Sequence, residues 1–180
     1  MHFSTLNPLL SPLLLLLTTP ALSQDYNTVL TDISAIKSNT SALSMAVTTV
    51  TPGILGLPSA LQVQVDAVTL SKTISHGASD ASASPPFGGA GSLAVGLALV
   101  DLQGTVRDAL ANTASKNASF GGLGPVVLAS LYALKDETTG FSDAVVAKLD
   151  SFEAALAPGI VSAIEGYFNE AILAYGGQAT

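Results

Sequence analysis

The sequence predicts an all-α protein, a bundle of about five helices. Three observations support this fold class: apolar residues recur every three or four positions, breaks rich in glycine and proline separate these stretches, and no convincing pair of strands occurs. Hydrophobic residues make up 48% of the chain and charged residues only 11%. This surplus of apolar side chains must face a core, a membrane, a ligand or a partner.

The first 23 residues have the pattern of a secretory signal peptide. Residues 9–17 are predominantly apolar and too short to span a bilayer of roughly 30 Å. Small residues at Ala21 and Ser23 match the cleavage rule, so we expect cleavage between Ser23 and Gln24. Residues 24–180 then form a single domain that is secreted, extracellular or associated with the cell wall, without a transmembrane segment.

A first helix is predicted over residues 25–50. Its apolar side chains are spaced four and three positions apart, which places them in one stripe at the helical period. Asp25 is a candidate N-cap, and Pro52 with Gly53 ends the helix.

A second helix is predicted over residues 58–75, with a wide apolar arc. The alternation of Val63 and Val65 with glutamines leaves a short strand as an alternative. Small residues, paired prolines and paired glycines over 76–91 predict the longest loop of the domain.

The third predicted helix, residues 92–115, is apolar on every side in its first half and amphipathic in its second half. A helix that is apolar all round is surrounded by other elements or by a ligand. Gly96 and Gly104 lie in its interior, where each glycine costs about 1 kcal/mol relative to alanine. They indicate either close helix packing or space left for something else.

A fourth helix is predicted from Gly124, because Pro125 suits a first helical turn. A turn is predicted at 136–140. The last segment, 142–175, carries apolar residues every three or four positions and contains Pro158. Proline disrupts a helix interior, so we expect one long helix that is kinked or split at Pro158.

No arrangement of residues points to catalysis. The chain has no cysteine, which excludes thiolate nucleophiles, thiolate metal sites and disulfides. His76, Ser79 and Asp80 are neighbours on a predicted loop and cannot adopt the geometry of a triad. The net charge of −7 argues against nucleic acid. With no motif for a metal or a phosphate, we expect a non-enzymatic protein without cofactor or metal.

Two sequons for N-linked glycosylation occur, at Asn39 and Asn117. Asn117 lies where the third helix gives way to a glycine-rich segment, so we expect it to be accessible. Asn39 lies within the first helix at the border of the apolar stripe, which makes it the weaker acceptor.

A further pattern follows the order of the predicted elements. Its positions are Ile33, Ile36 and Leu43 in the first helix, Ala60 and Leu61 at the start of the second, Leu131, Leu134 and Lys135 in the fourth, and Pro158 followed by residues 168–175. Over residues 26–176 this pattern resembles the fungal hydrophobic surface binding protein A and cell wall galactomannoprotein family. The chain departs from the family at the glycine-rich stretch 85–91.

The resemblance implies a five-helix domain, secreted or associated with the cell wall. It also implies that the protein binds a fatty acid in an internal apolar cavity, or adsorbs to hydrophobic surfaces and recruits a secreted hydrolase. A structural cell wall mannoprotein without a ligand is a third alternative.

The residues accommodate a fatty acid readily, because surplus apolar faces can enclose a pocket of roughly 300–1,000 Å³. Since basic residues are few, we expect the carboxylate head to lie in water at the mouth or to accept hydrogen bonds from Ser, Thr, Tyr or a helix N-terminus. The expected ligand-binding residues are Leu61, Val65, Val68, Leu97, Val100, Val127, Leu131, Phe152, Leu156, Ile164 and Phe168.

Overall fold

The structure is a computed structural model that describes residues 25–179, so the predicted signal peptide and its cleavage site lie outside the described residues. Within that range the chain is helical and contains no strand, which confirms the all-α prediction. The long helices are α1 (Tyr26–Thr49), α2 (Leu57–Ala83), α3 (Gly88–Ser115), α5 (Gly124–Val146) and α6 (Ser151–Ala174). Short helical pieces connect them: η1 (Ile54–Gly56), α4 (Asn117–Phe120) and η2 (Gly121–Leu123).

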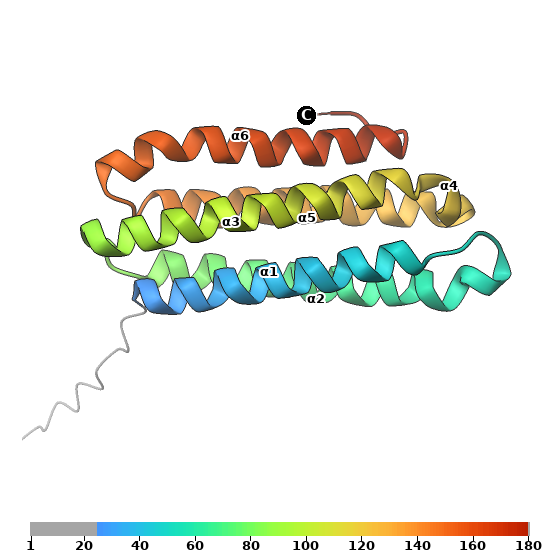
Figure 1. Ribbon diagram of the computed structural model, residues 1–180, viewed down its shortest axis with the longest axis horizontal. Helices are drawn as coiled ribbons and strands as arrows, with labels where there is room; N and C mark the ends of the chain where they lie inside the picture. The colour runs from blue at the N-terminus through green and yellow to red at the C-terminus, as the bar shows by residue number, and fades with distance from the viewer. Residues whose placement is uncertain (1–24, 180) are drawn as a thin grey trace, which may run out of the picture.

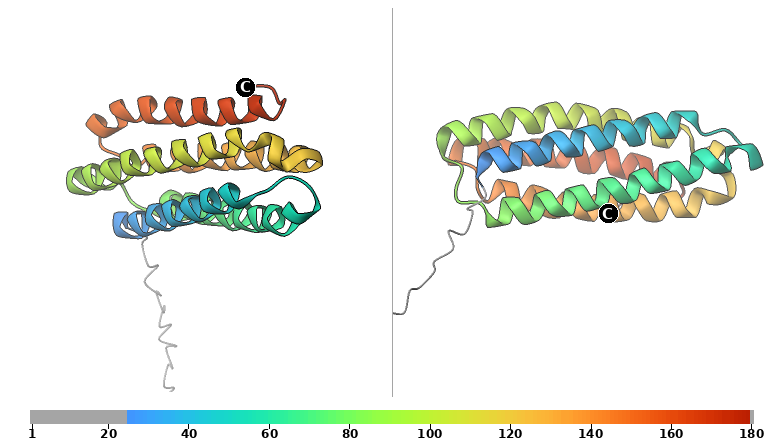
Figure 2. Two further views of the ribbon diagram at one scale, coloured as in Figure 1. Left: turned by 45° about the vertical axis from the view of Figure 1, so that its right-hand side comes forward. Right: turned by 90° about the horizontal axis from the view of Figure 1, so that it is seen from below.

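The five long helices lie roughly along one axis in three layers (Figure 1). Helices α1 and α2 form the first layer, α3 and α5 the second, and α6 alone the third. Helix α1 packs against α2 and α3, α2 packs against α5, and α6 packs against both α3 and α5. The two other views in Figure 2 show the same neighbours. The buried apolar residues of all five helices form one continuous core.

Helix α1 follows the sequence prediction closely. The carboxylate of Asp25 caps it by accepting hydrogen bonds from the backbone N–H groups of Asn27 and Thr28, at 3.0 and 3.1 Å. The apolar stripe is buried, and the helix ends just before Pro52. Local signals suffice here because the stripe and both helix ends agree.

The prediction of a long loop over 76–91 is wrong. Helix α2 continues to Ala83, and only residues 84–87 separate it from α3. The small residues here allow close packing: a Cβ atom added to Gly77 would lie 3.1 Å from Cε2 of Phe141 on α5 and 3.2 Å from Cβ of Asp32 on α1. The strand alternative for Val63 and Val65 is also wrong, since both lie within α2.

The predicted turn at 136–140 is likewise wrong, because α5 runs through it to Val146. Hydroxyl groups of Thr138 and Thr139 donate hydrogen bonds to carbonyl groups one helical turn earlier, at 2.6 and 3.1 Å. The chain turns instead at 147–150. The N–H of Phe87 donates to the carbonyl of Lys148 there, at 2.9 Å.

The prediction that the last helical segment begins at 142 is wrong, because residues 142–146 complete α5 and α6 starts at Ser151, after the turn. Helix α6 is uninterrupted, with Pro158 inside it. Of the predicted alternatives, the split into two helices is not found. Pro158 is exposed, so the carbonyl group that loses its helical partner can be hydrated.

The two glycines inside α3 are not required by close packing. No atom lies within 4 Å of the position where a Cβ atom of Gly104 would stand, and Gly96 has only Cγ of Glu153, at 3.7 Å. By length and composition alone, Gly88–Ser115 and Asn117–Val146 are apolar enough to cross a membrane. Core helices of a bundle pass the same test.

Candidate functional site

An apolar cavity lies inside the bundle, and all five long helices contribute to its wall. On α5 the lining extends from Val127 to Ser142, about 22 Å at 1.5 Å per residue. The volume of the cavity, about 80 Å³, is small for this length. The cavity is therefore long and narrow. Its largest apolar side chains are Ile36, Leu43, Val47, Val63, Leu70, Ile74, Leu99, Leu102, Val106, Leu110, Val127, Leu131, Leu134, Phe141, Ile164 and Phe168.

The polar residues in the cavity wall carry no charge. Among the described residues that line the cavity there is no Lys, Arg, His, Asp or Glu. The hydroxyl groups of Thr40 and Thr113 donate to the carbonyl groups of Ile36 and Ala109 on their own helices, both at 2.8 Å. Because these donors are already bonded within their helices, the wall offers a guest mostly methyl and methylene groups.

A second hollow of about 270 Å³ lies between α2 and α5. Gln64, Ala67, Ser130 and Leu134 line both the central cavity and this hollow. The hydroxyl of Ser130 donates a hydrogen bond of 3.1 Å to Oε1 of Gln64, which joins the two helices. This hydrogen-bonded pair therefore stands where the cavity approaches the surface.

Four of the eleven predicted ligand-binding residues line the cavity: Val127, Leu131, Ile164 and Phe168. The other seven do not, and their side chains are exposed to solvent, so the prediction that they face the central cavity is wrong, although Val68 lines the hollow between α2 and α5. They are Leu61, Val65, Val68, Leu97, Val100, Phe152 and Leu156.

The physical reason is that α2, α3 and α6 are apolar on more than one face. On α2, Val63, Ala67 and Leu70 form the inward stripe. Leu61 and Val65 have the same helical spacing on another face. Periodicity alone cannot show which stripe meets the neighbouring helices.

The α1 side of the cavity was not predicted as ligand-binding. Ile36, Thr40, Leu43 and Val47 line it, and all four have the spacing of the stripe in the first predicted helix. The spacing that predicted their burial was a usable signal, but it does not separate a cavity wall from a filled core.

Many of the exposed large apolar residues belong to two groups. One is the connection between α1 and α2 with the start of α2, where Ile54 is 83% exposed and Leu55 is 91% exposed. The other comprises residues of α3 and α6, which pack side by side (Figure 1). Its members are Leu93, Leu97 and Val100 on α3, with Phe152 and Leu156 on α6.

The two sequons differ in accessibility. Asn117 is exposed at the start of α4, and its side-chain amide donates to the carbonyl of Ala174 at 2.7 Å. Asn39 is half-buried, and its amide donates to Oγ1 of Thr73 on α2 at 2.8 Å. A glycan on Asn39 would have to displace this contact between helices.

Fold and cavity together define an all-helical domain with an apolar interior space. Among the described residues that line this space, no group of side chains has the composition of a catalytic site. The chain belongs to the hydrophobic surface binding protein A family, whose family model matches residues 26–147. No curated protein matches it.

Solved structures share this fold. The crystal structure of Afmp4p in complex with palmitic acid is 26% identical, with a TM-score of 0.80 over 84% of this chain and 99% of that one. Ligand binding domain 1 of Penicillium marneffei MP1 protein, complexed with arachidonic acids, is 18% identical with a TM-score of 0.74, over 81% and 94% of the two chains. Domain 2 of the same protein, complexed with multiple arachidonic acids, is 19% identical with a TM-score of 0.72, over 85% and 95%.

Proposed function

We propose that this protein binds a fatty acid or a similar apolar ligand in the cavity between its helices and has no enzymatic activity. The observation that carries the proposal is the long apolar cavity with no charged group in its described lining. The similarity to structures that hold palmitic and arachidonic acids supports it.

The energy available from an acyl chain is large. Each buried methylene contributes about 0.8 kcal/mol, so about 14 methylenes contribute on the order of 11 kcal/mol before costs. Lost translational freedom costs at least about 4 kcal/mol, which still permits micromolar binding. Because the cavity is narrow, the lining side chains must also move apart as the ligand enters.

The carboxylate head has no cation to pair with inside the cavity. We place it at the Gln64–Ser130 pair, where the side-chain amide N–H groups of Gln64 can donate hydrogen bonds and water is close. The acyl tail then extends along α5 toward Phe141.

Native mass spectrometry of the secreted protein tests this function. We expect a co-purified lipid at one copy per chain, and a higher melting temperature with ligand than without it. A protein that carries no lipid and does not respond to added fatty acid would exclude cavity binding.

Adsorption to hydrophobic surfaces is a second candidate function, and the exposed apolar residues favour it. Such residues supply the contact that an interface-active helical protein needs. An adsorbing protein is depleted from solution by apolar beads, whereas a cavity binder saturates with ligand. Recruitment of a secreted hydrolase to that surface belongs to this candidate and is tested by co-sedimentation of the hydrolase with coated beads.

We also propose that the protein is secreted after cleavage at residue 23 and acts outside the cell or at the cell wall. The signal-peptide pattern supports this localisation. N-terminal sequencing of protein from the culture medium tests the cleavage.

Enzymatic removal of N-glycans from the secreted protein tests whether it is a glycoprotein modified at Asn117, its more accessible sequon. A structural mannoprotein would show neither ligand nor adsorption.

A further inference from the structure

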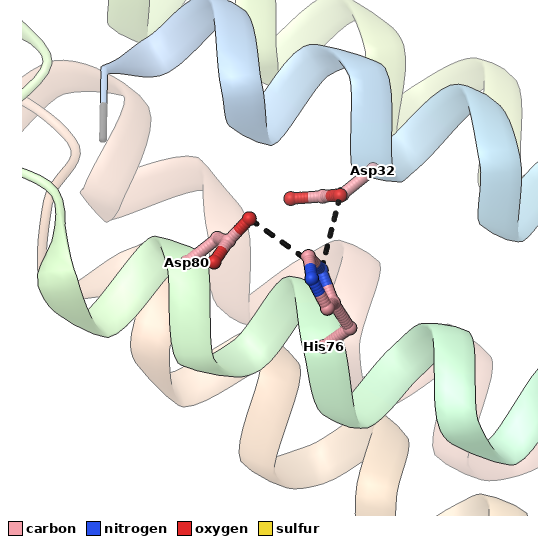
Figure 3. Close-up of side chains that lie close together, drawn as sticks. All are labelled: Asp32, His76 and Asp80. Carbon is pink, nitrogen blue, oxygen red and sulfur yellow. Dashed lines mark ion pairs between the residues drawn. The ribbon is translucent and has the colours of Figure 1, made fainter. Parts of the chain in front are cut away.

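Three side chains of types that can bind a metal ion lie close together, and they come from two helices (Figure 3). Asp32 comes from α1, and His76 and Asp80 come from α2. His76 and Asp80 are four residues apart, which places them on the same helical face. One ligand atom from each of the three residues lies within 4.8 Å of the others.

Two distances in this cluster are close to the spacing of ligands around one ion. Nδ1 of His76 lies 3.7 Å from Oδ1 of Asp32 and 3.5 Å from Oδ2 of Asp80. Both distances are longer than the usual 2.7–3.2 Å of an N–H···O hydrogen bond. Tetrahedral bonds of about 2.0–2.1 Å to one zinc ion separate neighbouring ligand atoms by about 3.4 Å.

Burial of the carboxylates is an independent observation. The side chain of Asp32 is 13% exposed and that of Asp80 is 11% exposed. Oδ2 of Asp32 is buried and has no hydrogen-bond partner. A buried carboxylate oxygen without a partner is costly, and a bound cation would satisfy it.

Packing fixes Asp32 in this position. A Cβ atom added to Gly77, between His76 and Asp80 in the sequence, would lie 3.2 Å from Cβ of Asp32. The absence of a side chain at Gly77 thus lets α1 approach α2 closely enough to bring the carboxylates together.

We propose that Asp32, His76 and Asp80 bind one divalent transition-metal ion of the zinc class. One imidazole nitrogen and two carboxylate oxygens are its protein ligands, and water completes the coordination. The imidazole favours such an ion over Mg²⁺ or Ca²⁺, which prefer oxygen ligands alone. The side chain of His76 is 71% exposed, so the ion can enter from solvent. Bound there, it joins α1 to α2.

The sequence did not reveal this site, and we expected no metal. Asp32 lies far from His76 along the chain, and the region around His76 was predicted to be a loop. Only the extension of α2 beyond residue 75 places the three side chains together.

Calorimetric titration with ZnCl₂ tests the proposal, using chain 24–180 without an affinity tag after treatment with EDTA. We expect one ion per chain, and a melting temperature raised by roughly 5–10 °C at 100-fold excess over Kd. MgCl₂ at the same concentration should leave the melting temperature unchanged.

His76→Gln is the decisive variant, because an exposed side chain is removed and the fold should persist. The affinity for zinc should fall further in this variant than when a residue that only supports a metal ligand is lost. Loss of such a supporting residue costs about 10–100-fold. Asp66→Asn, on the same helix but outside the cluster, is the control and should bind zinc like the wild type.

Asp32→Asn should also lose zinc binding while keeping its helical circular dichroism spectrum. Three results would overturn the proposal: no heat of binding and no thermal shift with zinc, equal binding of zinc and magnesium, or unchanged zinc binding in folded His76→Gln. In each case the cluster is only a pairing of an imidazole with two carboxylates.

Discussion

Ser130 on α5 and Gln64 on α2 are hydrogen-bonded across the edge of the cavity, at 3.1 Å. We predict that Gln64→Glu weakens the binding of a fatty acid by about tenfold or more, since a like charge then faces the ligand carboxylate. Competition of a fluorescent fatty acid with unlabelled ligands measures the change.

The matched ligand for this variant is a fatty alcohol with the same chain length. It has no carboxylate, so its affinity should change little. Equal losses for acid and alcohol would mean that the head group does not lie at Gln64.

A second prediction concerns the width of the cavity. Ala67 lies between the cavity and the α2–α5 hollow, and Ala67→Phe would fill the space there. We expect acyl binding to weaken by at least about tenfold, because the ligand and the new ring compete for one volume. Ligand-induced shifts in melting temperature report the loss.

Leu97→Asp serves as the control for that experiment. Leu97 is 64% exposed on α3 and outside the cavity wall, so the variant should bind acyl ligand normally. Loss of binding in folded Leu97→Asp would move the site to the outer face of α3.

A third prediction separates adsorption from cavity binding. Ile54 and Leu55 are the most exposed large apolar residues in the described chain. The double variant Ile54→Ser and Leu55→Ser should reduce depletion by apolar beads while acyl binding stays unchanged. Equal depletion of variant and wild type would exclude this end of the bundle as the contact surface.

A fourth prediction concerns the connection between α1 and α2. A Cβ atom at Gly56 would lie only 1.7 Å from the carbonyl oxygen of Thr51. Gly56→Ala should therefore lower the free energy of unfolding by about 1–3 kcal/mol. Gly104→Ala is the paired control: its Cβ meets no atom within 4 Å, so it should raise the same free energy by about 0.5–1 kcal/mol. Urea denaturation of both variants checks the two signs.

A fifth prediction concerns Tyr175, whose hydroxyl donates to the carbonyl of Thr113 at 2.9 Å. Burial raises the pKa of Tyr175 to about 12, from an ordinary value of 10.0. Between these values the unfolded chain binds fewer protons than the native protein, so stability falls as pH rises. The advantage of wild type over Tyr175→Phe should be about 1 kcal/mol at pH 8 and should shrink above pH 10. A difference in unfolding free energy that stays constant up to pH 11 would contradict this.

The sequence predicted α1 accurately because the spacing of its apolar residues, the Asp25 cap and Pro52 all agree. It placed the ends of α2 and α5 too early, for two different reasons. Around Gly77 small residues resembled a loop but serve close packing, and at 136–140 polar residues resembled a turn but lie on a helix.

The sequence predicted that an apolar cavity exists, but it predicted only some of the residues that line it. Leu131 lies in the cavity wall as predicted because the apolar residues of α5 form a clear inward face, and Phe168 also lies there although α6 is apolar on more than one face. Leu61 and Leu97 were misassigned because apolar residues on several faces of α2 and α3 satisfy the same period. Which face of a helix turns inward depends on the helices packed against it. The spacing of residues within one helix does not contain that information.

Ile164 and Phe168 close one side of the cavity, and both belong to α6, the final long helix of the described chain. Without α6, the four preceding long helices leave that side of the cavity open. Under the proposed function, a lipid that arrives before α6 docks reaches the lining through this open side, whereas one that arrives later must push the lining side chains apart.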